Sequence, residues 1–432
     1  MTEPSTSEKP PRTTGEFLRF EPVRHYLVST FALYTGVALQ AATLYWQVYD
    51  ISGREADLGF IGLAEFLPAA LLVLVTGSVS DRFDRRHVAI VASFGEFVGA
   101  LALMVYALSD PTSTLPLFAV AFWFGVSRAF QAPAIRAMPP MVAPEGGLPR
   151  TIALSNATWT AAVIIGPVTA GLLITIDPWV AYAAASVLVL IGWLGLFRIR
   201  FVRRPEPPDP DERPSLRSAV EGLRFIRRTP VLLAAISLDL FAVLLGGAMA
   251  LLPVIAEEQL GVGQVGYGWL RAAPGIGAAL MAVWLATRPV QRRVGPTLLW
   301  TVAVFGLGTV TLGLTASFAI AFISLLVIHA ADMVSVLIRG SLVPLLTPDE
   351  KRGRVLAVEN VFIGASNELG AFRSGVLAQA VGAQATVVGG GLATLIVVAL
   401  WSVLFPSLRR VDRFDDLEPG GGAEAPGQST PG

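Results

Sequence analysis

The chain has 432 residues, of which 53% are hydrophobic and 15% are charged, and its formal net charge is zero. Its mean hydropathy is +0.63, whereas soluble proteins carry roughly 25% charged residues, so the composition excludes an ordinary soluble domain and indicates an integral membrane protein. Cysteine is absent, which excludes disulfides and thiolate metal sites. Neither lysine lies in a G-x-x-x-x-G-K-[ST] motif, so the chain is not itself an ATPase.

Long apolar runs alternate with short polar turns along the chain. Residues 1–18 are polar and rich in Pro, Ser and Thr, which is typical of a disordered tail. A helix needs about 20 apolar residues to cross a bilayer, and twelve segments are about that long. They are residues 25–49, 58–79, 88–108, 115–137, 151–175, 180–198, 231–256, 265–287, 297–316, 318–346, 355–380 and 385–406.

One long polar segment, residues 199–230, separates the sixth span from the seventh. It begins with a charged, Pro-rich stretch that cannot cross a membrane. Residues 215–228 then place Leu216, Val220, Leu223 and Ile226 on one stripe, which predicts an amphipathic helix at the membrane interface.

The sequence therefore predicts an all-α membrane protein, with twelve transmembrane helices in two six-helix repeats around a central cavity. The expected parts are a cytoplasmic tail (1–18), a six-helix bundle (19–198), a cytoplasmic linker (199–230), a second six-helix bundle (231–408) and a second tail (409–432).

The distribution of basic residues predicts the orientation. Of the 32 basic residues, only Arg54 falls in a predicted outside loop. Positive charge beside membrane spans marks the cytoplasmic side, so both termini and the linker are expected in the cytoplasm. The preference for Arg over Lys and the many Ala and Gly residues favour a bacterial chain, and hence a bacterial inner membrane.

The two halves of the sequence repeat each other. Six residues recur at an offset of 204: Pro144, Arg150, Ala153, Asn156, Gly166 and Gly171 match Pro348, Arg354, Ala357, Asn360, Gly370 and Gly375. A second match pairs Gly62 with Gly268 and Pro68 with Pro274. A parallel repeat of this kind places a substrate cavity between the halves, near the middle of the bilayer, and rocking of one half on the other alternates access.

A short basic turn joins the second and third spans. Its residues Gly77, Asp81, Arg82, Arg85 and Arg86 resemble, in type and spacing, motif A of the major facilitator superfamily. The resemblance implies a gating loop whose charge contacts help to hold the cytoplasmic side closed. The sequence departs from the motif at residue 84, where Asp replaces a Gly. The alternative is that these are ordinary positive-inside anchors.

Arg128 and Gln131 lie one turn apart within the fourth span. A charge there costs at least about 2.5 kcal/mol, so the side chain is expected to face the bundle interior or a watery cavity. The pair resembles motif B of the same superfamily, which links the Arg to proton transfer, although Ala132 replaces the usual Gly. A structural ion pair with an acid on a neighbouring helix is the alternative.

In the fifth span, Gly166, Pro167 and Gly171 resemble part of motif C, which is associated with exporters that run as antiporters. Ala157 and Ala162 stand where the full motif has glycines. The alternative is a plain helix-packing kink, because small residues line helix interfaces.

Further ionisable residues lie within the predicted spans. Glu65 and Arg271 occupy equivalent positions of the two repeats, which predicts either an ion pair or a two-sided grip on the substrate. The leading candidates for proton coupling are Asp239, Asp332 and Glu368, because burial makes a carboxylate costly to ionise. Structural pairing is the alternative for each. The remaining charges are Glu96, Arg339, Glu359 and Arg373.

Segments 239–253, 270–278, 331–340 and 362–375 resemble the enterobactin-exporter and macrolide-efflux branch of that superfamily. The resemblance implies efflux of a siderophore, drug or amphiphilic metabolite, powered by the proton motive force without a cofactor or metal. The expected partners are a small-molecule substrate and the lipid bilayer, without nucleic acid, and the expected state is a monomer.

Three other functions remain open. The first alternative is an importer or facilitator of the same fold. A membrane subunit or receptor without transport is disfavoured by the intramembrane charges in both halves. An enzyme is not expected, because no Ser/His/Asp set, metal-ligand cluster or phosphate loop has a plausible spacing.

Overall fold

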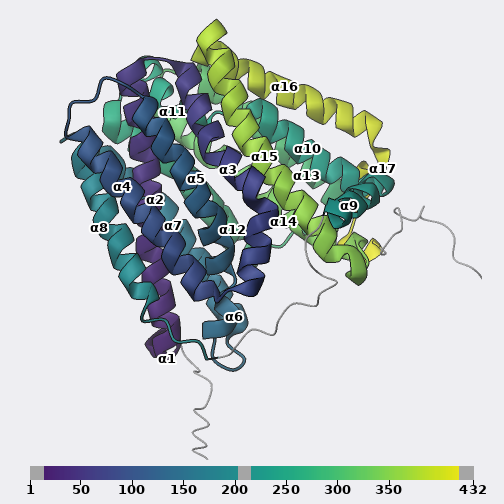
Figure 1. Ribbon diagram of the computed structural model, residues 1–432. Helices are drawn as coiled ribbons and strands as arrows, with labels where there is room; N and C mark the ends of the chain where they lie inside the picture. The colour runs from purple at the N-terminus through teal and green to yellow at the C-terminus, as the bar shows by residue number, and fades with distance from the viewer. Residues whose placement is uncertain (1–13, 203–215, 418–432) are drawn as a thin grey trace, which may run out of the picture.

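A computed structural model describes residues 14–202 and 216–417, without the side chains of residues 14, 16, 73–75, 77–82, 216 and 217. This part of the chain is helical and contains no strand (Figure 1). Twelve long helices form it: α2 (Glu21–Ser52), α3 (Glu55–Arg82), α4 (Arg85–Ala107), α5 (Leu115–Arg136), α7 (Leu148–Ile174), α8 (Pro178–Leu196), α10 (Pro230–Gly246), α12 (Gly263–Thr287), α13 (Val294–Leu314), α14 (Phe318–Leu346), α15 (Asp349–Val381) and α16 (Ala383–Leu404).

Ten of the described helical segments are long and apolar enough to cross a membrane. The two long helices outside that set, α3 and α15, have 28 and 33 residues. Helix α15 carries more polar residues than the other long helices, and α3 and α15 pack against each other within the bundle. The fold class predicted from the sequence, an all-α bundle of twelve membrane helices, is confirmed.

Short elements connect the long helices. They are α1 (Thr14–Arg19), α6 (Pro139–Val142), α9 (Leu216–Arg228), a 3-10 turn (Met249–Leu251), α11 (Leu252–Val254), a π-helical segment (Ile255–Gln259), α17 (Pro406–Arg409) and a 3-10 turn (Phe414–Asp416). In Figure 1, α1 and α6 lie at the bottom and α11 at the top. The end of the molecule that carries α1, α6, α9 and α17 is called the terminal end below, and the opposite end the far end.

Local signals in the sequence explain where several helices begin and end. The Asp84 side chain accepts a 2.8 Å hydrogen bond from the backbone N–H of Arg86 and so caps the start of α4. This is a function for the residue that replaces the second Gly of motif A. Asp177 caps α8 in the same way, through the N–H of Trp179. Gly53 ends α2 with a φ of 58°, a left-handed conformation that favours glycine.

The helices pair in the same way in both halves. In the N-half (α2–α8), α2 packs on α7 and α8, α3 on α5, and α4 on α5 and α8. In the C-half (α10–α16), α10 packs on α15 and α16, α12 on α14, and α13 on α14 and α16. Each pairing in one half therefore has its counterpart in the other, as the sequence repeat predicts.

The two halves meet through two reciprocal helix pairs, α7 with α12 and α3 with α15. Glycines bring the backbones close together in both pairs. A Cβ added at Gly171 would lie 2.9 Å from the Cα of Gly268, and one added at Gly375 would lie 2.8 Å from the Cα of Gly59. Small residues permit this close approach of membrane helices.

The hydrophobic clusters at the two ends of the molecule differ in which halves they join. Two clusters toward the far end contain residues of both halves, such as Leu39 with Leu270 and Val48 with Val254. Two clusters toward the terminal end each contain residues of one half only. The halves are therefore joined at the far end and packed separately at the terminal end.

The seventh span departs from the sequence prediction of one helix over 231–256. Helix α10 ends at Gly246, and its end is fastened to α15 by two side chains. Arg373 Nη2 donates to the carbonyl of Leu245 at 2.6 Å, and Ser374 Oγ donates to that of Gly247 at 2.7 Å. A broken helix is tolerated inside a membrane where neighbouring groups satisfy the freed carbonyls.

The amphipathic helix predicted in the linker is present as α9, but its apolar stripe is divided. Ile226 is fully buried against the C-half, whereas Val220 and Leu223 are exposed by 54% and 37%. Glu221 of α9 pairs with Arg354 of α15. The side chain of Leu216 lies outside the described part of the structure.

Candidate functional site

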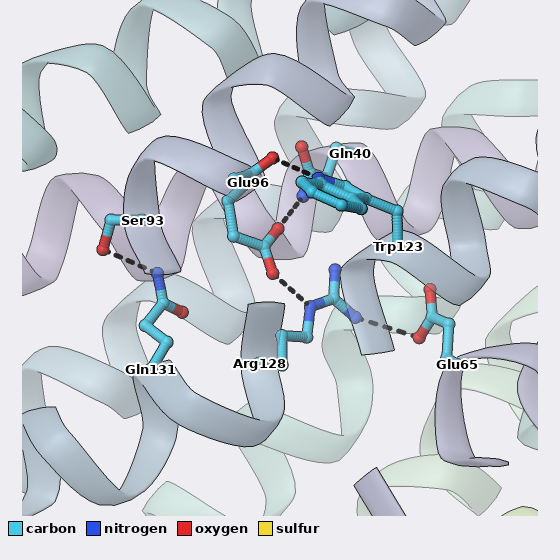
Figure 2. A network of polar contacts seen from close by, with 8 residues as sticks. Gln40, Glu65, Ser93, Glu96, Trp123, Arg128 and Gln131 are labelled. Carbon is cyan, nitrogen blue, oxygen red and sulfur yellow. Dashed lines mark hydrogen bonds and ion pairs between the residues drawn. The ribbon is translucent and has the colours of Figure 1, made fainter. Parts of the chain in front are cut away.

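A buried arginine joins three helices of the N-half (Figure 2). Arg128 of α5 donates from Nη1 to Glu65 Oε2 of α3 at 2.9 Å, and from Nε to Glu96 Oε1 of α4 at 3.1 Å. The Glu96 side chain is completely buried, while those of Glu65 and Arg128 keep 16% and 24% exposure. One cation therefore pairs with two carboxylates, which is the ion-pair alternative stated for Arg128.

Neutral side chains extend this network. Gln40 of α2 donates from Nε2 to the second oxygen of Glu96 at 2.7 Å. Trp123 Nε1 donates to the carbonyl of Gly95 at 2.8 Å. Gln131 points to another neighbour and donates to Ser93 Oγ of α4 at 2.9 Å (Figure 2). Gln131 lies one helical turn from Arg128 on α5, but its hydrogen bond goes to Ser93 and not to the carboxylates that Arg128 binds.

The carboxylate of Glu368, on α15 of the C-half, lies against the N-half. A Cβ added at Gly62 of α3 would lie 3.1 Å from Glu368 Oε2 and 3.0 Å from the hydroxyl of Tyr45. The guanidinium carbon of Arg271 lies 4.7 Å from the centre of the Tyr45 ring. Glu65, Arg128 and Arg271 all act electrostatically on Glu368. Glu65, Arg128, Arg271 and Glu368 are called the interhalf cluster below.

The sequence predicted either a Glu65–Arg271 ion pair or a two-sided grip. Among the ion pairs of the described residues, Glu65 is bonded to Arg128 and not to Arg271, while Arg271 stacks on Tyr45. The direct pair is absent from this conformation. The two-sided grip stays a prediction, and both residues belong to the interhalf cluster.

A second buried arginine joins helices of the C-half. Arg339 of α14 bonds from Nη2 to Asp239 Oδ1 of α10 at 2.8 Å, and its Nη1 lies 3.8 Å from Glu359 Oε1 of α15. Its side chain is 4% exposed. Asp332 has no ion pair among the described residues. With Asp239 and Ser335 it lines a cavity of about 10 Å³, roughly the space of one water.

The gating-loop residues lie at the terminal end of the N-half. Gly77, Asp81 and Arg82 belong to the end of α3, and their contacts lie outside the described part of the structure. Arg86 donates to the carbonyls of Ile199 at 3.0 Å and Phe197 at 2.8 Å, beyond the end of α8. Arg85 donates to the carbonyl of Ala137 at 3.4 Å. These two arginines bond within their own half, and the gating function stays a prediction.

The motif C residues lie where α7 touches two other helices. Helix α7 runs through Pro167 without interruption. A Cβ at Gly166 would lie 3.0 Å from the backbone N of Leu39 on α2, in the same half. Gly171 instead faces Gly268 of α12 in the other half. These small residues therefore fix α7 between its own half and the opposite one.

Sequence reasoning missed three side chains that complete the networks. Glu96 and Glu359 were noted as intramembrane charges but were not selected as site residues, and Gln40 was not included. The signal available for the two acids was their charge within a span, which is costly unless it is paired or used. The sequence indicates Gln40 only as a polar side chain for the lining of the cavity, because its bond to Glu96 depends on α2 facing α4.

Comparison with known proteins identifies the family to which this chain belongs. A model of the transmembrane secretion effector family matches residues 18–420. The chain belongs to this family of the major facilitator superfamily. It is 25% identical over 370 residues to the enterobactin exporter EntS of Escherichia coli O1:K1, covering 84% of this chain and 85% of that protein. EntS of Escherichia coli O127:H6 is equally similar.

Solved structures share the fold. A POT-family transporter in complex with 5-aminolevulinic acid superposes with a TM-score of 0.71 at 12% identity, over 89% of this chain and 96% of that one. A bacterial homologue of the iron transporter ferroportin superposes with a TM-score of 0.68 at 16% identity, over 90% and 98%. The chain is therefore a multi-pass membrane transporter with the fold that the sequence predicts.

Proposed function

We propose that this transporter exports a siderophore, drug or amphiphilic metabolite across a bacterial inner membrane in exchange for protons. The similarity to enterobactin exporters over most of both chains supports the direction and the substrate class. No cofactor is needed for this activity, because proton entry supplies the free energy.

The observation that carries proton coupling is an excess of embedded carboxylates over arginines in each of two charged networks. Three acids accompany two arginines around the interhalf cluster: Glu65, Glu96, Glu368, Arg128 and Arg271. Three acids accompany one arginine in the network around Arg339: Asp239, Asp332, Glu359 and Arg339. An uncompensated charge is costly in a low-dielectric interior, so binding of a proton offsets the excess.

Among the acids, Glu368 and Asp332 are the best placed to gain and lose a proton. Glu368 lies between the halves, where their rocking changes its surroundings. Asp332 borders a water-sized cavity and has no arginine bonded to it. Asp239 is held by Arg339 at 2.8 Å, and this pairing supports a structural function for it.

The orientation predicted from the basic residues assigns the terminal end to the cytoplasm. Since the halves are joined at the far end and packed separately at the terminal end, this conformation then accepts substrate from the cytoplasm. Release outside requires the α7–α12 and α3–α15 contacts at the far end to separate, as rocking of the two halves provides.

The test uses inside-out vesicles that contain the purified protein and an imposed pH gradient. A pH-sensitive dye follows the gradient while enterobactin, macrolides and cationic dyes are added. A substrate should dissipate the gradient, and Asp332→Asn or Glu368→Gln should abolish this response. The matched control is Asp110→Asn, which neutralises a carboxylate in an exposed loop.

Two outcomes contradict parts of the proposal. If vesicles take up a compound at the same rate with and without the gradient, the chain is a facilitator and proton coupling is wrong. If both carboxyl variants keep full coupling, the proton is carried elsewhere and the assignment of Asp332 and Glu368 is wrong.

A further inference from the structure

The N-half network leaves three buried polar atoms without a hydrogen-bond partner. They are Glu65 Oε1, Arg128 Nη2 and Gln40 Oε1. Buried polar groups are nearly always paired, and leaving one unpaired costs free energy. Three such atoms in one network indicate a position where a further polar group binds.

Two of the unpaired atoms face the same side of one ion pair. Arg128 Nη1 and Glu65 Oε2 are joined at 2.9 Å, and Figure 2 shows Arg128 Nη2 and Glu65 Oε1 pointing to the same side of that bond. One of these atoms can only donate and the other, on an ionised carboxylate, can only accept. A single hydroxyl oxygen can accept from the first and donate to the second.

The ion pair lies at the edge of the space between the halves, although its two unpaired atoms are themselves buried in this conformation. Glu65 and Arg128 keep partial exposure, whereas Glu96 behind them has none. Both residues act electrostatically on Glu368 of the opposite half. A ligand held between the halves therefore meets the exposed atoms of this ion pair first, and its hydroxyl group reaches the two buried atoms when the side chains of Glu65 and Arg128 shift. The completely buried Gln40 adds a further acceptor to the same network.

The local charge selects the kind of ligand group. Glu65 and Glu96 together outnumber Arg128 by one negative charge, so a carboxylate or phosphate is repelled. A fully methylated ether can accept from Arg128 but leaves Glu65 Oε1 unpaired. An uncharged hydroxyl group satisfies both atoms without adding charge.

We propose that Arg128 Nη2 and Glu65 Oε1 form a subsite that binds an uncharged hydroxyl group of the transported molecule, a phenol or an alcohol. The inference rests on the proposed function, since it names a chemical feature of the substrate at the same cluster. The subsite explains why an ion pair within the N-half retains one donor and one acceptor without a hydrogen-bond partner.

The test measures binding to the purified protein in lipid nanodiscs, in the absence of any pH gradient. The probes are catechol and its dimethyl ether, which have the same ring and differ in two hydroxyl hydrogens. Saturation-transfer NMR titration gives the two dissociation constants. Hydrogen bonds to charged groups make a large contribution, so catechol should bind at least about tenfold more tightly.

Two variants and one matched control locate the preference. Arg128→Lys keeps the positive charge but removes the planar fork that presents Nη2, and should reduce the preference to less than about threefold. Glu65→Gln can turn an amide donor toward the subsite, so it should favour the ether relative to the wild type. Arg339→Lys makes the same change in the C-half network and should keep the wild-type preference.

Several outcomes overturn the proposal. One is equal binding of catechol and its ether to the wild type, which would mean that only water binds at the subsite. Another is a preference for catechol that stays unchanged in both Arg128→Lys and Glu65→Gln. Tighter binding of benzoate than of catechol also overturns it, because the subsite excludes anions. Failure of proton coupling does not affect this test, since binding is measured without a gradient.

Discussion

At the scale of single residues, the two buried arginines are the main determinants of the site. Arg128 and Arg339 each pair with carboxylates from two other helices. A buried ion pair is weak evidence for stability, but removing one partner leaves an uncompensated charge and is strongly destabilising. Each arginine therefore compensates part of the negative charge of its acids and lowers the free-energy cost of placing them within the membrane.

Replacing Arg128 by alanine should lower the stability of the transporter by about 3–5 kcal/mol, because Glu65 and Glu96 then lose their counter-charge. The double variant Arg128→Ala/Glu96→Gln should recover part of this loss, because it removes one of the two unpaired acids. Thermal unfolding of the purified protein in detergent measures both. A double variant less stable than the single one would contradict this account of the network.

At the scale of helices, the glycine contacts between the halves determine how closely they approach. Gly171 and Gly268 touch through their backbones, and so do Gly59 and Gly375. No side chain fits at these four positions in this conformation. The far end therefore stays joined only while these positions remain small.

Gly171→Val should separate the halves at the far end, because a Cβ there would lie 2.6 Å from the carbonyl oxygen of Gln264. The native chain has no cysteine, so Tyr49 and Glu258, whose side chains are hydrogen-bonded, can be replaced by a cysteine pair for crosslinking. The yield with a short thiol-specific reagent should fall in Gly171→Val.

The control for this experiment is Gly389→Val on α16, where an added Cβ meets nothing within 4 Å. It should leave the crosslinking yield unchanged. An equal yield in Gly171→Val and in the parent would mean that α7 and α12 can move apart locally without separating the halves.

At the scale of the whole molecule, the reciprocal packing of the two halves indicates how access alternates. The same helix pairs recur within each half, so each half can move as one body. Among the described residues, α7 with α12 and α3 with α15 make most of the contacts between the halves, and α2 and the segment after α10 add contacts at the far end.

Crosslinking the cysteines at positions 49 and 258 should therefore stop transport, because the far end cannot open while it is covalently joined. A cleavable reagent allows the same vesicles to be assayed before and after reduction, and transport should return once the link is cut. Full transport by the crosslinked protein would exclude rocking about the terminal end as the way in which substrate leaves.

The sequence by itself determined the class of protein, the number of long helices, the twofold repeat and the presence of costly charges within the spans. These features are local, because the bilayer selects apolar segments by length and composition regardless of their neighbours. The candidate residues Glu65, Arg128, Arg271 and Glu368 could be selected for the same reason.

Only the tertiary structure decided which acid meets which arginine. Glu65 and Glu96 are 63 and 32 residues away from Arg128 in the chain, and their pairing depends on how α3, α4 and α5 are rotated about their axes. Packing of side chains between helices sets that rotation. The break after Gly246 was decided in the same way, since Arg373 and Ser374 of a distant helix bind the carbonyls that it frees.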